Sequence, residues 1–63
     1  MIQRGDRVLW LSRNKIGTVD RIASKQIIVK LDDPDPSHTN GKVTTTRLHL
    51  ISLHEAQNRW PNY

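Results

Sequence analysis

The strongest restriction on the fold is a pair of short apolar segments that flank a basic turn near the N-terminus. Residues 6–12 and 17–22 are rich in strand-forming residues, and the second segment opens on Gly17. Asn14, in the turn between them, tolerates a positive φ. In a chain of 63 residues, this arrangement predicts the opening of one very small β-barrel. Such a barrel has little interior for a catalytic pocket, so we expect its surface to carry the function.

The alternation of apolar and polar residues, together with turn-forming residues, predicts the secondary structure from residue 25 onward. In residues 25–31, the alternation turns Ile27, Val29 and Leu31 inward and Gln26, Ile28 and Lys30 outward. Two prolines and three aspartates follow, and these residues do not fit a strand ladder. The later elements are expected in this order: a loop at 32–41, a strand at 42–46, a helical turn at 47–49 and a short strand at 50–53.

These elements predict an all-β protein, a small, strongly bent, five-stranded SH3-like barrel formed by residues 1–53. A short tail at 54–63 follows it. Ser52 and Glu55 have the spacing of a helix capping box, but Pro61 leaves room for barely two turns. The tail is therefore expected to be a marginal helix or an extended segment.

The aromatic side chains of the tail, Trp60 and Tyr63, have no obvious partner within it. Either they fold back over an open end of the barrel or they contact another molecule. Packing on the barrel is the preferred interpretation, because so small a core gains much from one more buried aromatic side chain.

Composition excludes several classes of protein. The chain has no cysteine, so we expect neither a disulfide nor a thiolate metal site. It contains no apolar run of about 18 residues and does not open with a signal-peptide pattern. We expect a soluble, cytoplasmic protein without membrane insertion.

Motifs for catalysis or metal binding are not found. His38, His49 and His54 do not have the spacing of a metal-binding pair on one helical face, and no nucleophile or phosphate-loop motif occurs. Asp32, Asp33 and Asp35 lack the glycine and glutamate of a calcium loop. We expect no enzyme activity, no metal and no cofactor, and we expect these acids to confine an anionic ligand to the opposite side of the molecule.

The net charge of +4 is unevenly distributed. Residues 1–31 contain seven basic and two acidic side chains, a net charge of +5, whereas 32–63 contain three basic and four acidic ones, a net charge of −1. A field of this kind attracts anionic partners. The seven cations are Arg4, Arg7, Arg13, Lys15, Arg21, Lys25 and Lys30.

Five of these cations are the predicted phosphate contacts of a nucleic-acid-binding surface, because they belong to the turn or can project from the neighbouring strands. They are Arg7, Arg13, Lys15, Arg21 and Lys25. The alternative interpretation is a solvated hairpin tip without a partner.

Four apolar side chains are candidates for contact with a ligand or a partner. Trp10 could stack on an unpaired base, although a tryptophan in a first strand more often belongs to the core. Leu9, Ile28 and Trp60 could lie in a protein interface.

Part of this pattern resembles a known family. Gly5-Asp6-x-Val8-x-Trp10, a basic turn ending in Lys15-x-Gly17, and then Val19 and Ile22 resemble the KOW motif of ribosomal and transcription-elongation proteins. The resemblance covers residues 4–31 and implies a strand–loop–strand unit within an SH3-like barrel. It also implies that Gly17 is the structural glycine and that Arg13 and Lys15 face nucleic acid.

A second resemblance extends over most of the chain. Segments 2–5, 17–19, 29–32 and 43–45 are similar, in this order, to the small SH3-like subunit on the electron-acceptor side of photosystem I. This resemblance implies a basic barrel that docks acidic proteins such as ferredoxin.

These observations favour a non-enzymatic binding module for nucleic acid or a ribonucleoprotein. Two alternatives remain open: a docking module for an acidic protein within a larger complex, and a small inhibitor of an enzyme. Phosphates and carboxylates both attract arginine, so the sequence does not distinguish a nucleic-acid partner from an acidic protein partner.

Overall fold

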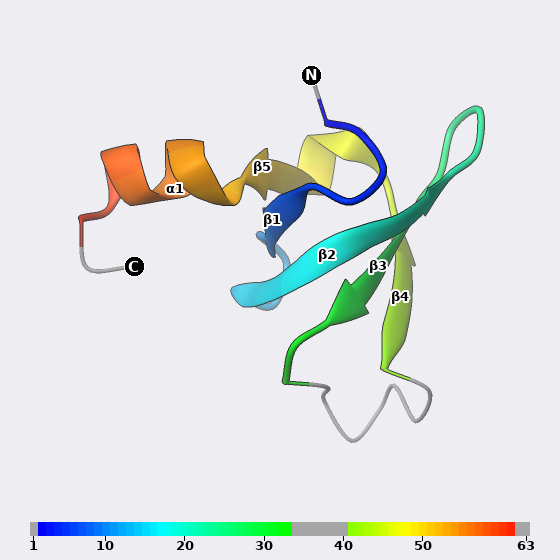
Figure 1. Cartoon of the computed structure of the whole chain (residues 1–63), viewed down its shortest axis with the longest axis horizontal. Helices are drawn as coiled ribbons and strands as arrows, with labels where there is room; N and C mark the ends of the chain where they lie inside the picture. The colour runs from blue at the N-terminus through cyan, green and yellow to red at the C-terminus, as the bar shows by residue number, and fades with distance from the viewer. Residues whose placement is uncertain (1, 34–40, 62–63) are drawn as a thin grey trace.

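The computed structural model describes residues 2–33 and 41–61, in which strands predominate (Figure 1). All strand pairings are antiparallel, and the order across the sheet is β4-β3-β2-β1-β5. The small five-stranded all-β fold predicted from the sequence is confirmed. Its elements are β1 (Arg7–Trp10), β2 (Lys15–Ile22), β3 (Ile27–Leu31), β4 (Lys42–Thr45), the 3₁₀ turn η1 (Arg47–His49), β5 (Leu50–Ser52) and α1 (Leu53–Arg59).

The turn between β1 and β2 forms as predicted, with Asn14 at a φ of 58°. However, β2 begins at Lys15, two residues before the glycine at which a strand start was expected. The reason is the hairpin register, which pairs Trp10 with Lys15 and Leu9 with Ile16. Gly17 is therefore an interior strand residue, and it lies directly opposite Val8.

The main core lies on the concave side of the sheet. The predicted inward residues of β3 are buried there, and Ile28 between them is half-buried, as its alternation indicated. Trp10 belongs to this core and is 9% exposed. The buried members of the cluster are Val8, Trp10, Val19, Ile27, Val29, Leu31, Val43 and Leu50.

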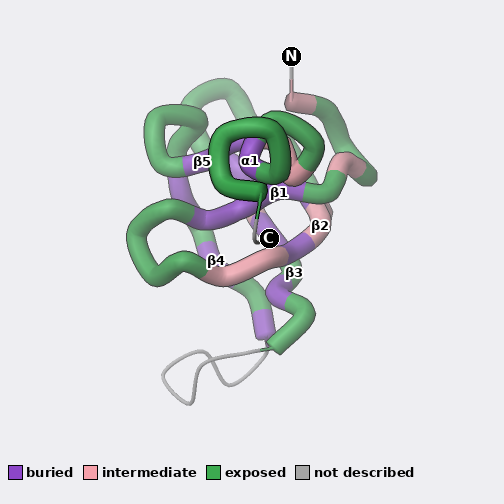
Figure 2. The backbone as a smooth tube through the Cα atoms, turned by 90° about the vertical axis from the view of Figure 1, so that its left-hand side faces the viewer, coloured by how far each residue is buried: buried purple, intermediate pink, exposed green. Residues whose placement is uncertain are grey.

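A second, smaller cluster joins the C-terminal helix to the other side of the sheet. Leu9 and Ile51 are cross-strand neighbours, and both pack with Ala56 of α1. Figure 2 looks along α1, which lies over β1 and β5. Ser52 caps this helix, because its hydroxyl accepts a hydrogen bond of 3.2 Å from the Glu55 backbone N–H.

The helix packs on the sheet through a residue that the sequence analysis did not single out. Ala56 is completely buried, whereas Trp60 remains 43% exposed. A small side chain on the inner face lets the helix approach the sheet closely. Trp60 lines a hollow with Leu9, Leu11 and Asn14 at the end of the helix. Tyr63 and most of the predicted loop at 32–41 lie outside the described residues.

Candidate nucleic-acid interface

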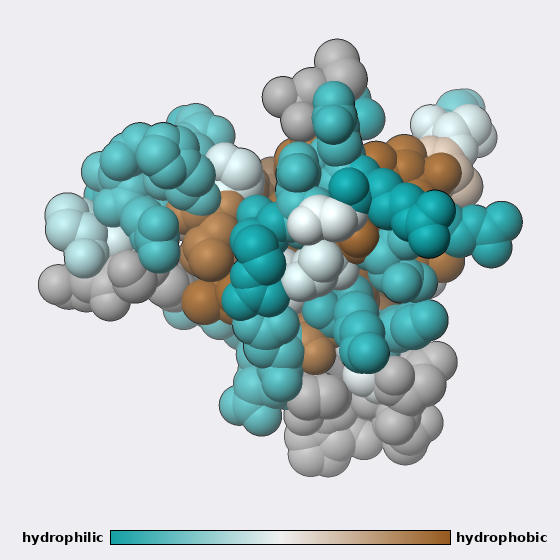
Figure 3. Space-filling view, viewed as in Figure 1, coloured by the Kyte–Doolittle hydropathy of each residue, from teal (hydrophilic) through white to brown (hydrophobic). Residues whose placement is uncertain are grey.

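The convex side of β2, β3 and β4 forms a polar surface, which we call the outer face. Its position follows from the register, since Val8, Val29 and Val43 point into the core and their neighbours along each strand point away from it. The outer face comprises Arg7, Thr18, Asp20, Arg21, Ile28, Lys30, Asp32, Lys42 and Thr44. Among these, Arg7, Thr18, Lys30 and Lys42 form one cross-strand row. In the view of Figure 3, hydrophilic side chains cover much of the molecule and apolar ones gather between α1 and the strands.

A β-bulge in β2 brings Arg21 to the outer face. Val19 pairs with Val29, but Arg21 pairs with the next residue of β3, Ile28, so Asp20 is an extra residue. Without this insertion, strict alternation from Val19 would turn Arg21 toward the core. The bulge therefore presents both Asp20 and Arg21 on the same outward side.

Arg7 is held by an acid of the outer face. Its Nη1 donates to Asp32 Oδ1 at 2.8 Å and to Thr18 Oγ1 at 2.9 Å, and its Nη2 donates to Asp32 Oδ2. This hydrogen-bonded pair lowers the pKa of the Asp32 carboxyl below its ordinary value, and it raises the pKa of Arg7. The prediction that the loop acids lie opposite the basic surface is therefore wrong for Asp32.

A pH titration tests this pair. We expect NMR to show the pKa of the Asp32 carboxyl below its usual range, and Arg7→Gln to raise that pKa toward its ordinary value. Because the pKa is lowered in the folded state, the stabilisation is present above about pH 4 and is lost as the pH falls through the folded-state pKa. Its size is below about 1 kcal/mol, since both side chains are 47% exposed. An unchanged Asp32 titration in Arg7→Gln would contradict the pairing.

The second acid of the outer face is also held by a cation. Asp20 Oδ2 lies 3.2 Å from Lys42 Nζ. Arg21 and Lys30 are exposed and make no ion pair with any other described residue. The outer face has a net charge of +2, because it holds four cations and only the two carboxylates of Asp20 and Asp32. Two of the cations, on Arg7 and Lys42, are paired with these acids, so the charge available to a ligand is concentrated on Arg21 and Lys30.

The five predicted contacts do not form one cluster. Arg13 lies in the turn before β2 and Lys15 begins the strand, whereas Arg21 lies near its far end and Lys25 in the turn after it. Lys15 and Arg21 are about 20 Å apart along the strand. Lys15 is half-buried and pairs with Trp10, which places it on the side of the main core. Only Arg7 and Arg21 reach the outer face.

The predicted apolar contacts are distributed just as widely. Trp10 is packed in the main core and Leu9 is 1% exposed beneath α1, so neither presents a surface to a ligand in this structure. Ile28 is half-buried on the outer face between Arg21 and Thr44. Trp60 is exposed at the end of α1, beside Leu11.

Lys30 is the residue of this surface that the sequence analysis did not select. It lies between Thr18 and Lys42 in the cross-strand row. The alternation of β3 already assigned it an outward direction, so a signal was present. Its proximity to Arg21 depended on the strand pairing and on the bulge.

In the described part of the chain, no three histidine or acidic side chains come together as a metal-binding group. His38 and Asp35 lie outside that part. No helix among the described residues is long and apolar enough to cross a membrane. Comparison with known proteins finds no match to a family model, to a curated protein or to a solved structure.

Proposed function

We propose that the protein is a non-enzymatic module that binds nucleic acid through its phosphate backbone, on the outer face. The observation that carries this proposal is the pair Arg21 and Lys30. Both side chains are exposed, and both lie on a face whose two acids are already bound to other cations. An approaching phosphate therefore meets two cations that need not give up an internal ion pair.

The composition of the face favours contact with the backbone over reading of bases. It contains hydroxyl groups, on Thr18 and Thr44, and one partly buried aliphatic side chain, Ile28. Hydroxyls and cations are the usual donors to phosphate oxygens. None of its residues is aromatic, so it has no platform on which a base could stack. We infer weak, non-specific binding that depends strongly on salt.

Fluorescence anisotropy with a labelled oligothymidine tests this function. The wild-type protein is expected to bind in about 50 mM salt and to lose affinity steeply as salt rises, because bound counterions are released. The double variant Arg21→Gln/Lys30→Gln should bind roughly tenfold more weakly. Its plot of log K against log salt concentration should be shallower by about 1.4, since single strands contribute about 0.7 per phosphate contact.

A matched control has the same change in net charge at the other end of β2. Arg13→Gln/Lys15→Gln also removes two cations, and these are the residues that the KOW resemblance would place against nucleic acid. We expect this variant to bind within about threefold of the wild type. A larger loss here than in Arg21→Gln/Lys30→Gln would assign the contact to the first turn, and no binding at low salt would exclude the nucleic-acid function altogether.

A further inference from the structure

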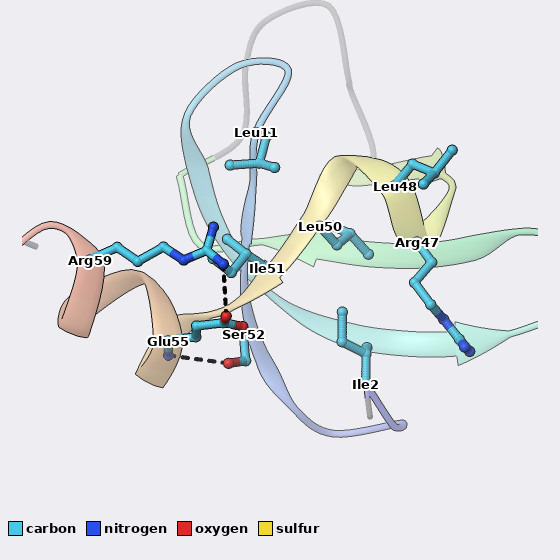
Figure 4. Close-up of a pocket in the computed structure, with 9 residues that line it drawn as sticks. All are labelled: Ile2, Leu11, Arg47, Leu48, Leu50, Ile51, Ser52, Glu55 and Arg59. Carbon is cyan, nitrogen blue, oxygen red and sulfur yellow. Dashed lines mark hydrogen bonds and ion pairs between the residues drawn. The ribbon is translucent and has the colours of Figure 1, made fainter.

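A groove lies away from the outer face, between the N-terminal segment, η1, β5 and α1 (Figure 4). Its volume is about 460 Å³. Leu50 and Ile51 line it from β5, and Ile2, Leu11 and Leu48 line it from the surrounding segments. Its lining is therefore largely aliphatic.

Two of these leucines are open to solvent. Leu48 is 88% exposed and Leu11 is 43% exposed, although both line the same groove. Single exposed leucines are common, but exposed aliphatic side chains gathered along one groove are typical of an interaction site. None of the three residues of η1 is buried, so Leu48 has no packing role in this structure.

The groove follows the edge of the sheet. β5 is the last strand in the sheet order and pairs only with β1 among the described strands. Successive side chains of a strand point to opposite sides, yet all three residues of β5 line the groove. A groove that touches both sides of a strand runs along its edge, where backbone groups can pair with an added strand. The Leu50 N–H is already bound to the Arg47 carbonyl, so an added strand would pair with the remaining edge groups of β5.

The charge of the groove selects the occupant. Arg59 Nη2 is bound to Glu55 Oε1 at 3.0 Å, which neutralises that pair. Arg47 lines the same groove, is exposed and makes no ion pair within the described residues. The groove is therefore apolar with one available cation. A second copy docked through the same groove would supply another available cation and no available carboxylate to meet it, which disfavours a dimer.

We propose that this groove binds an extended acidic segment of a partner protein. The segment adds to the edge of β5 as a further strand, packs aliphatic side chains against Leu11 and Leu48, and places a carboxylate against Arg47. Main-chain pairing supplies affinity, and the alternate side chains supply selectivity. This site is independent of the nucleic-acid function and uses none of the outer-face residues.

An NMR titration with a capped pentapeptide of alternating aspartate and leucine tests the proposal. We expect saturable shifts of the backbone amides of β5 and of Leu11 and Leu48, with a Kd near the millimolar range. Leu48→Ser and Arg47→Gln should each weaken binding at least about fivefold. Both residues are exposed, so the melting temperature of each variant should stay close to that of the wild type.

Matched variants outside the groove control for general effects. Ile22→Ser removes another exposed aliphatic side chain and Arg21→Gln removes another exposed cation, and neither should change the affinity for the peptide. Absence of saturable binding would overturn the proposal. Equal binding of a lysine–leucine peptide or of a fully N-methylated peptide would do so as well, because charge selection or strand pairing would then be lacking. A dimer that disappears in Leu48→Ser would assign the groove to a second copy instead.

Discussion

Gly17→Val is expected to destabilise the protein more than any other single substitution considered. A Cβ atom at this position would lie 2.6 Å from the Lys30 carbonyl oxygen and 2.7 Å from Val29 Cγ1. The first of these atoms belongs to the backbone of β3, so it cannot move aside without breaking the central pairing. We expect a cost above about 3 kcal/mol, against a total stability of roughly 3–9 kcal/mol for a domain of this size.

Thermal and urea unfolding followed by circular dichroism measure this effect. The melting temperature of Gly17→Val should fall by at least about 15 °C. Gly5→Ala is the matched control, because Gly5 has a φ of +90° but a Cβ atom added there would meet no neighbouring atom within 4 Å. Its cost should be only about 1 kcal/mol of backbone strain. Equal stabilities of Gly17→Val and the wild type would show that β2 and β3 do not approach one another as described.

Ala56→Asp is expected to have the second-largest effect. Ala56 is fully buried against Leu9 and Ile51, so an aspartate would place an uncompensated carboxylate in the smaller cluster. The expected loss is about 3 kcal/mol or more at pH 7. The loss should shrink as the pH falls toward the pKa of the buried acid, because the protonated form is less costly to bury.

Gln57→Asp adds the same charge to the next residue of the same helix, where the side chain is exposed. Its free energy of unfolding should stay within about 0.5 kcal/mol of the wild-type value. Comparable losses in the two variants would mean that the charge acts on the helix itself and that α1 does not depend on packing against the sheet.

Much of the fold was predictable because local signals agreed with one another. The alternation in β3, the positive φ of Asn14 and the turn before β5 all appear in the structure as expected. The requirement for glycine at position 17 was also predictable, although the physical reason is a close backbone approach inside a strand. A strand boundary depends on the register of its partner, so the start of β2 was placed too late.

The surface was less predictable than the core. Arg7 was expected to meet a phosphate, but it is bound to Asp32, which is 25 residues away in the sequence. Leu9 was an interface candidate, and its burial depends on a helix that the sequence predicted only as marginal. A short helix is unstable in isolation, so its existence is decided by the surface that it covers.

The sequence by itself determined the number of strands, the inward and outward side chains of most of them, and the excess of positive charge in the first half. These properties follow from nearest-neighbour geometry and composition. Only the tertiary structure decided which charges remain available to a ligand. The bulge at Asp20 turned Arg21 outward, and pairing across strands neutralised Arg7 and Lys42 while leaving Lys30 exposed. Both effects depend on register between segments distant in sequence, and the periodicity of a single strand does not contain that register.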